Sequence, residues 1–245
     1  MAAPAAVRRL FGALCALMYP RGACCVACGA LRTDDEAGLL CRACAEELAK
    51  PLPARCPGCG AEGWKSLCPE CSARLPRDFL AGYAPYGYAG AAGSLVRRLK
   101  YDCVCEAAEP LAEAMSACLP PEPFDALVPA PLNRLRERER GFNQARVLCE
   151  AVGRRMNLPV LDALERVRYT KTQTHLSAGE REKNVANVFR CSRDVAGLRI
   201  ILVDDVRTTG ATAKSCARTL LAAGAQRVIL LTATVAAHRA SRAKG

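Results

Sequence analysis

The stretch Ile200–Thr212 constrains the fold most, because it joins an apolar run to two carboxylates and a hydroxyl-rich turn. Its first residues, Ile-Ile-Leu-Val, are apolar and mostly β-branched, which is typical of a strand buried on both faces of a parallel sheet. Ligands of such sheets bind beyond the carboxyl ends of the strands. We therefore expect Asp204 and Asp205 to emerge at that edge of an α/β domain.

The turn after the acid pair leads into a predicted helix over residues 211–224, which is rich in alanine and leucine and ends in glycine. A loop that ends in a helix N-terminus offers free N–H groups to a phosphate. Carboxylates can accept hydrogen bonds from vicinal ribose hydroxyls, while loop amides and threonine hydroxyls surround a 5′-phosphate. An acid pair that only binds Mg²⁺ or caps the helix would leave the threonines unexplained. The predicted sugar-phosphate site comprises Asp204, Asp205, Val206, Arg207, Thr208, Thr209, Gly210, Ala211 and Thr212.

This order of strand, acid pair, Thr-Thr-Gly and helix resembles the phosphoribosyl-pyrophosphate (PRPP) loop of type I phosphoribosyltransferases. The resemblance implies that Asp204 and Asp205 hold the ribose and that Thr208–Thr212 hold the 5′-phosphate. It also implies that Mg²⁺ accompanies PRPP, and that backbone groups of a second loop approach the pyrophosphate. That second loop comprises Ala130, Pro131, Leu132 and Asn133.

Cysteine spacing gives the second strong pattern, because the chain has 16 cysteines and eight of them form successive Cys-x-x-Cys pairs. Such pairs are typical of zinc ribbons, in which four thiolates surround one ion. A disulfide framework is the alternative, but it would require export. We assign two structural Zn²⁺ sites, although interleaved pairing, or Cys24 in place of Cys25, would also satisfy the spacing. The proposed ligands are Cys25, Cys28, Cys41 and Cys44 for one ion, and Cys56, Cys59, Cys68 and Cys71 for the other.

Charge and the N-terminal sequence bear on partners and compartment. The formal net charge is +11, and two tetrathiolate zinc sites would lower it to roughly +7. A basic protein suits phosphorylated ligands or nucleic acid. Apolar residues between Val7 and Met18 follow helical spacing in a segment too short to span a membrane, which favours an amphipathic helix and a cytoplasmic protein. A secretory signal peptide is the minority interpretation.

The remaining sequence alternates strands with helices, which predicts a parallel α/β sheet flanked by helices after a small Cys-rich double zinc ribbon. Residues 79–88 suggest a short hairpin. Helices are expected at 91–99, 105–119 and 142–156, and strands at 126–128 and 227–232. The predicted domains are an N-terminal helix (1–22), the double ribbon (23–76), a phosphoribosyltransferase-like domain (77–237) and a disordered basic tail (238–245).

Two polar segments are further candidates. Residues 134–140 are dense in arginine, so they either form a solvated, salt-bridged segment with the alternating glutamates or place one or more of these arginines, Arg140 among them, against a pyrophosphate or nucleic-acid backbone. Residues 166–184 are long and irregular by pattern, as lids often are. From this segment we predict Thr170, Gln173 and Arg181 on the pyrophosphate or lid side, and we treat His175 as a loop histidine.

Taken together, the ribbons, Leu99-Lys100-Tyr101, Arg138 to Gln144, residues 170–184 and the loop after Asp205 resemble the ComF competence-protein family. The resemblance implies a phosphoribosyltransferase or PRPP-binding protein with Zn²⁺ and Mg²⁺, associated with natural competence and DNA uptake. The alternative is a non-catalytic accessory protein that binds single-stranded DNA and the competence machinery. One departure, Asp102-Cys103 in place of a small or glycine-containing turn, leaves the role of Lys100 open.

Overall fold

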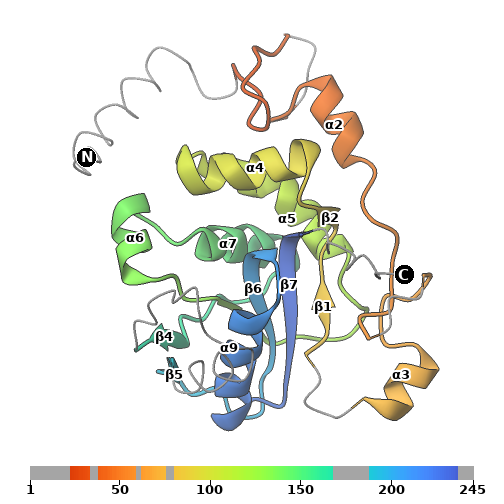
Figure 1. Cartoon of the computed structure of the whole chain (residues 1–245), viewed down its shortest axis with the longest axis vertical. Helices are drawn as coiled ribbons and strands as arrows, with labels where there is room; N and C mark the ends of the chain where they lie inside the picture. The colour runs from red at the N-terminus through yellow and green to blue at the C-terminus, as the bar shows by residue number, and fades with distance from the viewer. Residues whose placement is uncertain (1–22, 34–37, 59–61, 76–79, 168–187, 237–245) are drawn as a thin grey trace, which may run out of the picture.

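A computed structural model describes residues 23–33, 38–58, 62–75, 80–167 and 188–236. Its centre is a parallel sheet in the order β1-β7-β6-β3, with β2 also paired to β7 (Figure 1). The strands are β1 (Gly82–Tyr83), β2 (Tyr86–Gly87), β3 (Ala126–Pro129), β6 (Arg199–Arg207) and β7 (Arg227–Val235). The predicted α/β class with a parallel sheet is confirmed.

The sheet has one core on each face because alternate side chains of its central strands point in opposite directions. Ile201 and Val203 of β6 pack in one core, and Ile200 and Leu202 pack in the other. All four are fully buried. The apolar run at residues 200–203 is therefore buried on both faces of the sheet, as predicted.

Helices cover both faces of the sheet (Figure 1). Residues of α4 and α5 and most buried residues of α7 join the first core, whereas those of α9, together with Ala145 of α7, join the second. The short helix α6 follows β3 and ends at Gly141 in the left-handed conformation. The predicted helices are present with shifted ends: α4 (Gly90–Tyr101), the 3₁₀ turn η1 (Cys105–Ala107) with α5 (Ala108–Ala117), α7 (Gln144–Met156) and α9 (Ala211–Ala222). The helix α6 (Arg134–Arg140) was not among the predicted elements.

The hairpin predicted for residues 79–88 is wrong. Strands β1 and β2 both pair in parallel with β7, and they keep one register, Gly82 opposite Leu230 and Tyr86 opposite Thr234. They are two pieces of a single edge strand, interrupted where Pro85 has no N–H to donate to the ladder. The glycine and proline residues of this segment are typical of a hairpin turn. The true pairing partner, β7, lies far away in the sequence, so the local pattern could not indicate it.

A smaller antiparallel pair, β4 (Leu164–Arg166) and β5 (Phe189–Cys191), flanks the predicted lid. The pairing brings the two ends of that segment together. Residues 168–187 themselves lie outside the described residues, as do the predicted N-terminal helix, the boundary near residue 76 and the basic tail.

The cysteine-rich region contains α2 (Arg42–Leu48) and α3 (Pro69–Arg74). Its first half packs on the sheet domain: Leu48 O accepts the Tyr86 hydroxyl at 2.8 Å, and Glu47 Oε1 accepts Ala91 N at 3.0 Å. Within the described part of the chain, every helix is too short or too polar to cross a bilayer.

Candidate functional site

The acid pair lies inside β6 rather than beyond its end. Asp204 stands opposite Thr232, and the ladder continues to Arg207 opposite Val235. Successive side chains of a strand point to opposite faces, so the two carboxylates leave the backbone in opposite directions. Each therefore meets different neighbours.

Asp204 faces the turn that precedes α9. Its carboxylate oxygen Oδ1 accepts the backbone N–H of Asp205 at 2.8 Å. Burial, and then the neighbouring Asp205 carboxylate, raise the pKa of Asp204 to about 7. With the turn it lines a hollow of about 60 Å³, whose other walls are Val206, Arg207, Thr208, Thr209, Gly210, Ala211, Thr212, Ala213, Leu230 and Thr232.

The turn is shaped by Gly210, which adopts φ +75° and caps α9. That left-handed conformation costs glycine little. Thr209 Oγ1 accepts Ala211 N at 3.5 Å, and the first-turn N–H groups that follow have no partners within α9. A helix N-terminus of this kind favours an anion. The structure thus brings Asp204 and the residues predicted to hold the 5′-phosphate around one hollow.

Asp205 faces α4, where it meets the residue whose role the sequence leaves open. Lys100 Nζ lies 2.9 Å from Asp205 Oδ1, and the two side chains are 15% and 7% exposed. Asp205 Oδ2 is buried without a hydrogen-bond partner among the described residues. It therefore retains an acceptor that a ligand hydroxyl could use. The spacing of Lys100 on α4 could not predict a contact made across the fold.

The predicted pyrophosphate-side loop, Ala130–Asn133, lies beside the acid-bearing strand. Ala130 N donates to Val203 O at 2.8 Å. Asn133 caps α6 by accepting Leu135 N at 2.9 Å. Pro131 and Leu132 lie in the same turn, between β3 and α6.

Asn143 anchors the same loop and is absent from the predicted site. Its Nδ2 donates to Ala130 O at 3.0 Å, and its Oδ1 accepts Ala145 N at 2.9 Å. The cap on α7 is readable from sequence as an asparagine before a helix. The bond to Ala130 is not, because it depends on how α7 packs against β3.

Arg140 is held at the end of α4. Its Nη1 donates to Gln144 Oε1 at 2.9 Å, and its guanidinium lies 5.2 Å from the centre of the Tyr101 ring. Arg140 therefore lies against Tyr101, the residue that follows Lys100 in α4. The other predicted lid residues, Thr170, Gln173 and Arg181, lie outside the described residues.

The cysteines form two clusters in the described region. Sulfur atoms of Cys25, Cys28, Cys41 and Cys44 all lie within 4.8 Å of one another, as do those of Cys56, Cys68 and Cys71. Cys59, the remaining predicted ligand, lies outside the described residues. The grouping is sequential rather than interleaved.

Geometry and charge in the first cluster suit a tetrahedral metal ion. The sulfurs of Cys28 and Cys41 are 3.7 Å apart, and Zn–S bonds of about 2.3 Å place two tetrahedral sulfurs about 3.8 Å apart. Burial raises the pKa of Cys25, but hydrogen bonds from the backbone of Cys28, Cys41 and Ala27 outweigh it and set the value at about 6. Burial and neighbouring thiols raise the pKa of Cys44. Without a cation, four thiolates this close would repel one another.

Comparison with known proteins agrees with this arrangement. Residues 143–244 match the phosphoribosyl transferase domain family. DNA utilization protein YhgH of Salmonella typhi is 34% identical over 201 residues, which cover 77% of this chain and 87% of the relative. Competence protein ComFC of Bacillus subtilis is 28% identical and covers 89% and 91%, respectively. The chain belongs to the ComF family.

Competence protein F of Haemophilus influenzae is another ComF relative, 35% identical over 42% of this chain and 47% of its own. Among solved structures, glutamine phosphoribosylpyrophosphate amidotransferase from B. subtilis is 22% identical with a TM-score of 0.38, covering 51% of this chain and 26% of that chain. The type I phosphoribosyltransferase-like fold of this ComF protein rests on the family match and on the parallel sheet described above.

Proposed function

We propose that this ComF protein binds PRPP at the hollow between Asp204 and the N-terminus of α9. The observation that carries the proposal is the meeting of a carboxylate, threonine hydroxyls and helix N–H groups at one end of β6. These groups complement the hydroxyls and the 5′-phosphate of a phosphorylated ribose. A phosphoribosyltransferase fold supports the same ligand class.

Each part of PRPP has proposed partners. The turn from Thr208 to Thr212 surrounds the 5′-phosphate, and Asp204 accepts a ribose hydroxyl. Asp205 is assigned to the other hydroxyl, and its buried Oδ2, which has no partner among the described residues, would become accessible when the ligand binds. The pyrophosphate extends toward Ala130–Asn133, which hydrogen bonds fix next to β6.

Asp204 offers the hard carboxylate oxygen that Mg²⁺ prefers, whereas Asp205 pairs with Lys100 on the other face of β6. When bound with PRPP, Mg²⁺ would neutralise charge on the pyrophosphate. For transfer, the bond from ribose C1 to the pyrophosphate oxygen breaks and pyrophosphate leaves, while an acceptor bonds to C1. Carboxylates beside the ribose stabilise the positive charge that develops on the sugar.

Zinc is the proposed metal of the cysteine clusters. Thiolate-only coordination is typical of closed structural zinc sites, and the first cluster packs against α4, where Arg98 Nη1 donates to Cys25 O at 3.2 Å. Zinc would therefore stabilise the attachment of the cysteine-rich region to the sheet domain.

Binding of PRPP to site variants tests the proposal. Thr209→Ala removes a hydroxyl of the turn, and Asp205→Asn removes a carboxylate. Each should weaken PRPP binding by roughly tenfold, the effect of losing one or two kcal/mol of polar interaction. Thr219→Ala is the matched control, since its hydroxyl bonds Ser215 O within α9. Unchanged PRPP affinity in both site variants would reject the assignment.

A second candidate function is binding of single-stranded DNA within a competence or DNA-utilization process. It is supported by the relatives' names, the formal charge of +11 and the exposed side chains of Arg136 and Arg138 on α6. Binding through phosphates should weaken steeply as salt increases, for random as well as specific oligonucleotides. Weak, salt-insensitive binding would count against this function.

A further inference from the structure

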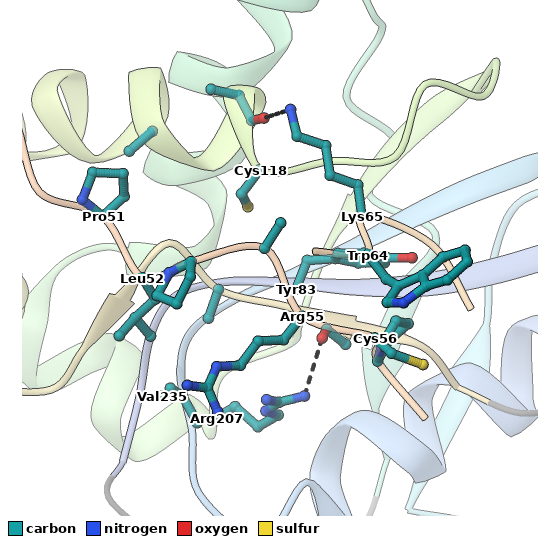
Figure 2. Close-up of a pocket in the computed structure, with 17 residues that line it drawn as sticks. Pro51, Leu52, Arg55, Cys56, Trp64, Lys65, Tyr83, Cys118, Arg207 and Val235 are labelled. Carbon is teal, nitrogen blue, oxygen red and sulfur yellow. Dashed lines mark hydrogen bonds between the residues drawn. The ribbon is translucent and has the colours of Figure 1, made fainter. Parts of the chain in front are cut away.

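A separate cavity of about 520 Å³ lies between the second half of the cysteine-rich region and the sheet domain (Figure 2). One wall is formed by residues 51–57 with Trp64 and Lys65, and the opposite wall by β1, α5 and the ends of β6 and β7. Its volume falls within the range of small-molecule sites in proteins.

The cavity carries positive charge from Arg55, Lys65 and Arg207, and none of its lining residues is acidic. Arg55 pairs with Glu62 at 2.5 Å, outside the lining. Lys65 Nζ donates to Ala117 O at 3.3 Å, a neutral carbonyl. Two of the three cations are therefore available to an anionic ligand.

Of these two cations, Arg207 gives the stronger indication of an anionic ligand. It is the last residue of β6, next to the turn near Asp204, but its guanidinium points to the cavity and donates from Nη1 to Gly82 O at 3.2 Å (Figure 2). A side chain at position 82 would clash with that guanidinium. Among the described residues, no carboxylate forms a salt bridge with Arg207, and burial lowers its pKa. A half-buried cation of this kind is stabilised by an anion.

The cavity lining also includes exposed apolar side chains. Trp64 is 40% exposed and Leu52 is 45% exposed, and both line the cavity (Figure 2). An exposed indole next to cations is a stacking surface for a nucleobase, as in proteins that bind single-stranded nucleic acids. An inorganic anion would leave this surface uncovered.

We infer that this cavity binds a nucleotide, with its base against Trp64 and its phosphate attracted by the positive charges of Lys65 and Arg207, which lie on opposite sides of the cavity in Figure 2. The nucleotide is either free or part of a single strand, since both present the same base and phosphate. The basic sequence after Val235 is a poor occupant because its charge has the same sign as the cavity. The inference does not depend on PRPP binding.

The chain has a single tryptophan, so Trp64 fluorescence reports on this cavity alone. The zinc-loaded full chain is titrated with thymidine 5′-monophosphate, thymidine, inorganic phosphate and a short oligothymidylate. We expect saturable quenching by the nucleotide, and roughly tenfold weaker binding for Lys65→Glu. Lys50→Glu changes an exposed lysine outside the lining and controls for net charge.

Tighter binding of the oligothymidylate than of the mononucleotide would identify the ligand as a nucleotide within a single strand. Thr209→Ala should leave nucleotide binding unchanged, which separates this cavity from the PRPP turn. The inference is overturned by the absence of quenching with either thymidylate probe, by equal effects of Lys65→Glu and Lys50→Glu, or by phosphate alone reproducing the full response. Loss of nucleotide binding in Thr209→Ala would also overturn it, because the ligand would then occupy the turn.

Discussion

Replacing Lys100 by methionine should lower the free energy of unfolding, because it removes one partner of the buried Lys100–Asp205 ion pair. Lys100 Nζ and Asp205 Oδ1 are 2.9 Å apart, and both side chains are less than one-fifth exposed. Their gross attraction is about 6 kcal/mol at an effective dielectric constant of about 20. Removing one partner of a buried pair costs about 3–5 kcal/mol, because the other charge stays buried without compensation.

The net cost of the Lys100→Met change is smaller than the gross attraction, because the structure and solvent relax around the carboxylate that remains. We expect a loss of about 3–4 kcal/mol at pH 7.

Urea unfolding of zinc-loaded protein, followed by far-UV circular dichroism, measures this deficit. Lys214→Met, which changes an exposed lysine on α9, should cost less than about 0.5 kcal/mol. The double variant Lys100→Met/Asp205→Asn should recover much of the lost stability, since neither charge of the pair remains. A Lys100→Met deficit no larger than that of Lys214→Met would refute the ion-pair reasoning.

Three further predictions concern the acid, the turn and the metal. Burial raises the pKa of Asp204 to about 7. The stability that protonation of Asp204 contributes is therefore fully present below about pH 4 and is lost as the pH rises through 7. Asp204→Asn should therefore gain stability relative to wild type from pH 5 to pH 8, by no more than about 4 kcal/mol, and equal urea midpoint differences at both pH values would contradict this. Gly210→Ala, at φ +75°, should cost about 1 kcal/mol in thermal unfolding and weaken PRPP binding; an unaltered melting temperature and affinity would exclude strain there. Thiol titration with a zinc indicator should release about two Zn²⁺ per chain and chelation should lower the melting temperature, whereas a metal-free, equally stable protein would reject the zinc sites.

Sequence patterns predict those parts of the molecule that depend on local order. The buried strand before Asp204, the glycine turn and α9 follow one another in the chain, so their relative positions are nearly fixed by connectivity. The Cys-x-x-Cys pairs are equally local. Both patterns carry over to the structure.

Features that depend on long-range packing were not predictable in the same way. The pairing of β1 and β2 with β7 depends on residues about 150 positions away, so turn residues alone suggested a hairpin. Lys100 reaches Asp205 only because α4 packs on the sheet, and Asn143 reaches Ala130 only because α7 packs against β3. The direction of the Arg207 side chain depends on Gly82 of the edge strand.

Calorimetric titration of the zinc-loaded protein with PRPP, with and without Mg²⁺, tests the proposed PRPP-binding site most directly. Ribose 5-phosphate, which lacks the pyrophosphate, is the control ligand. We predict saturable PRPP binding that strengthens with Mg²⁺, and weaker binding of ribose 5-phosphate with little dependence on Mg²⁺. Absence of PRPP binding to a folded sample, with or without Mg²⁺, would contradict the proposal that the turn beside Asp204 is a PRPP site.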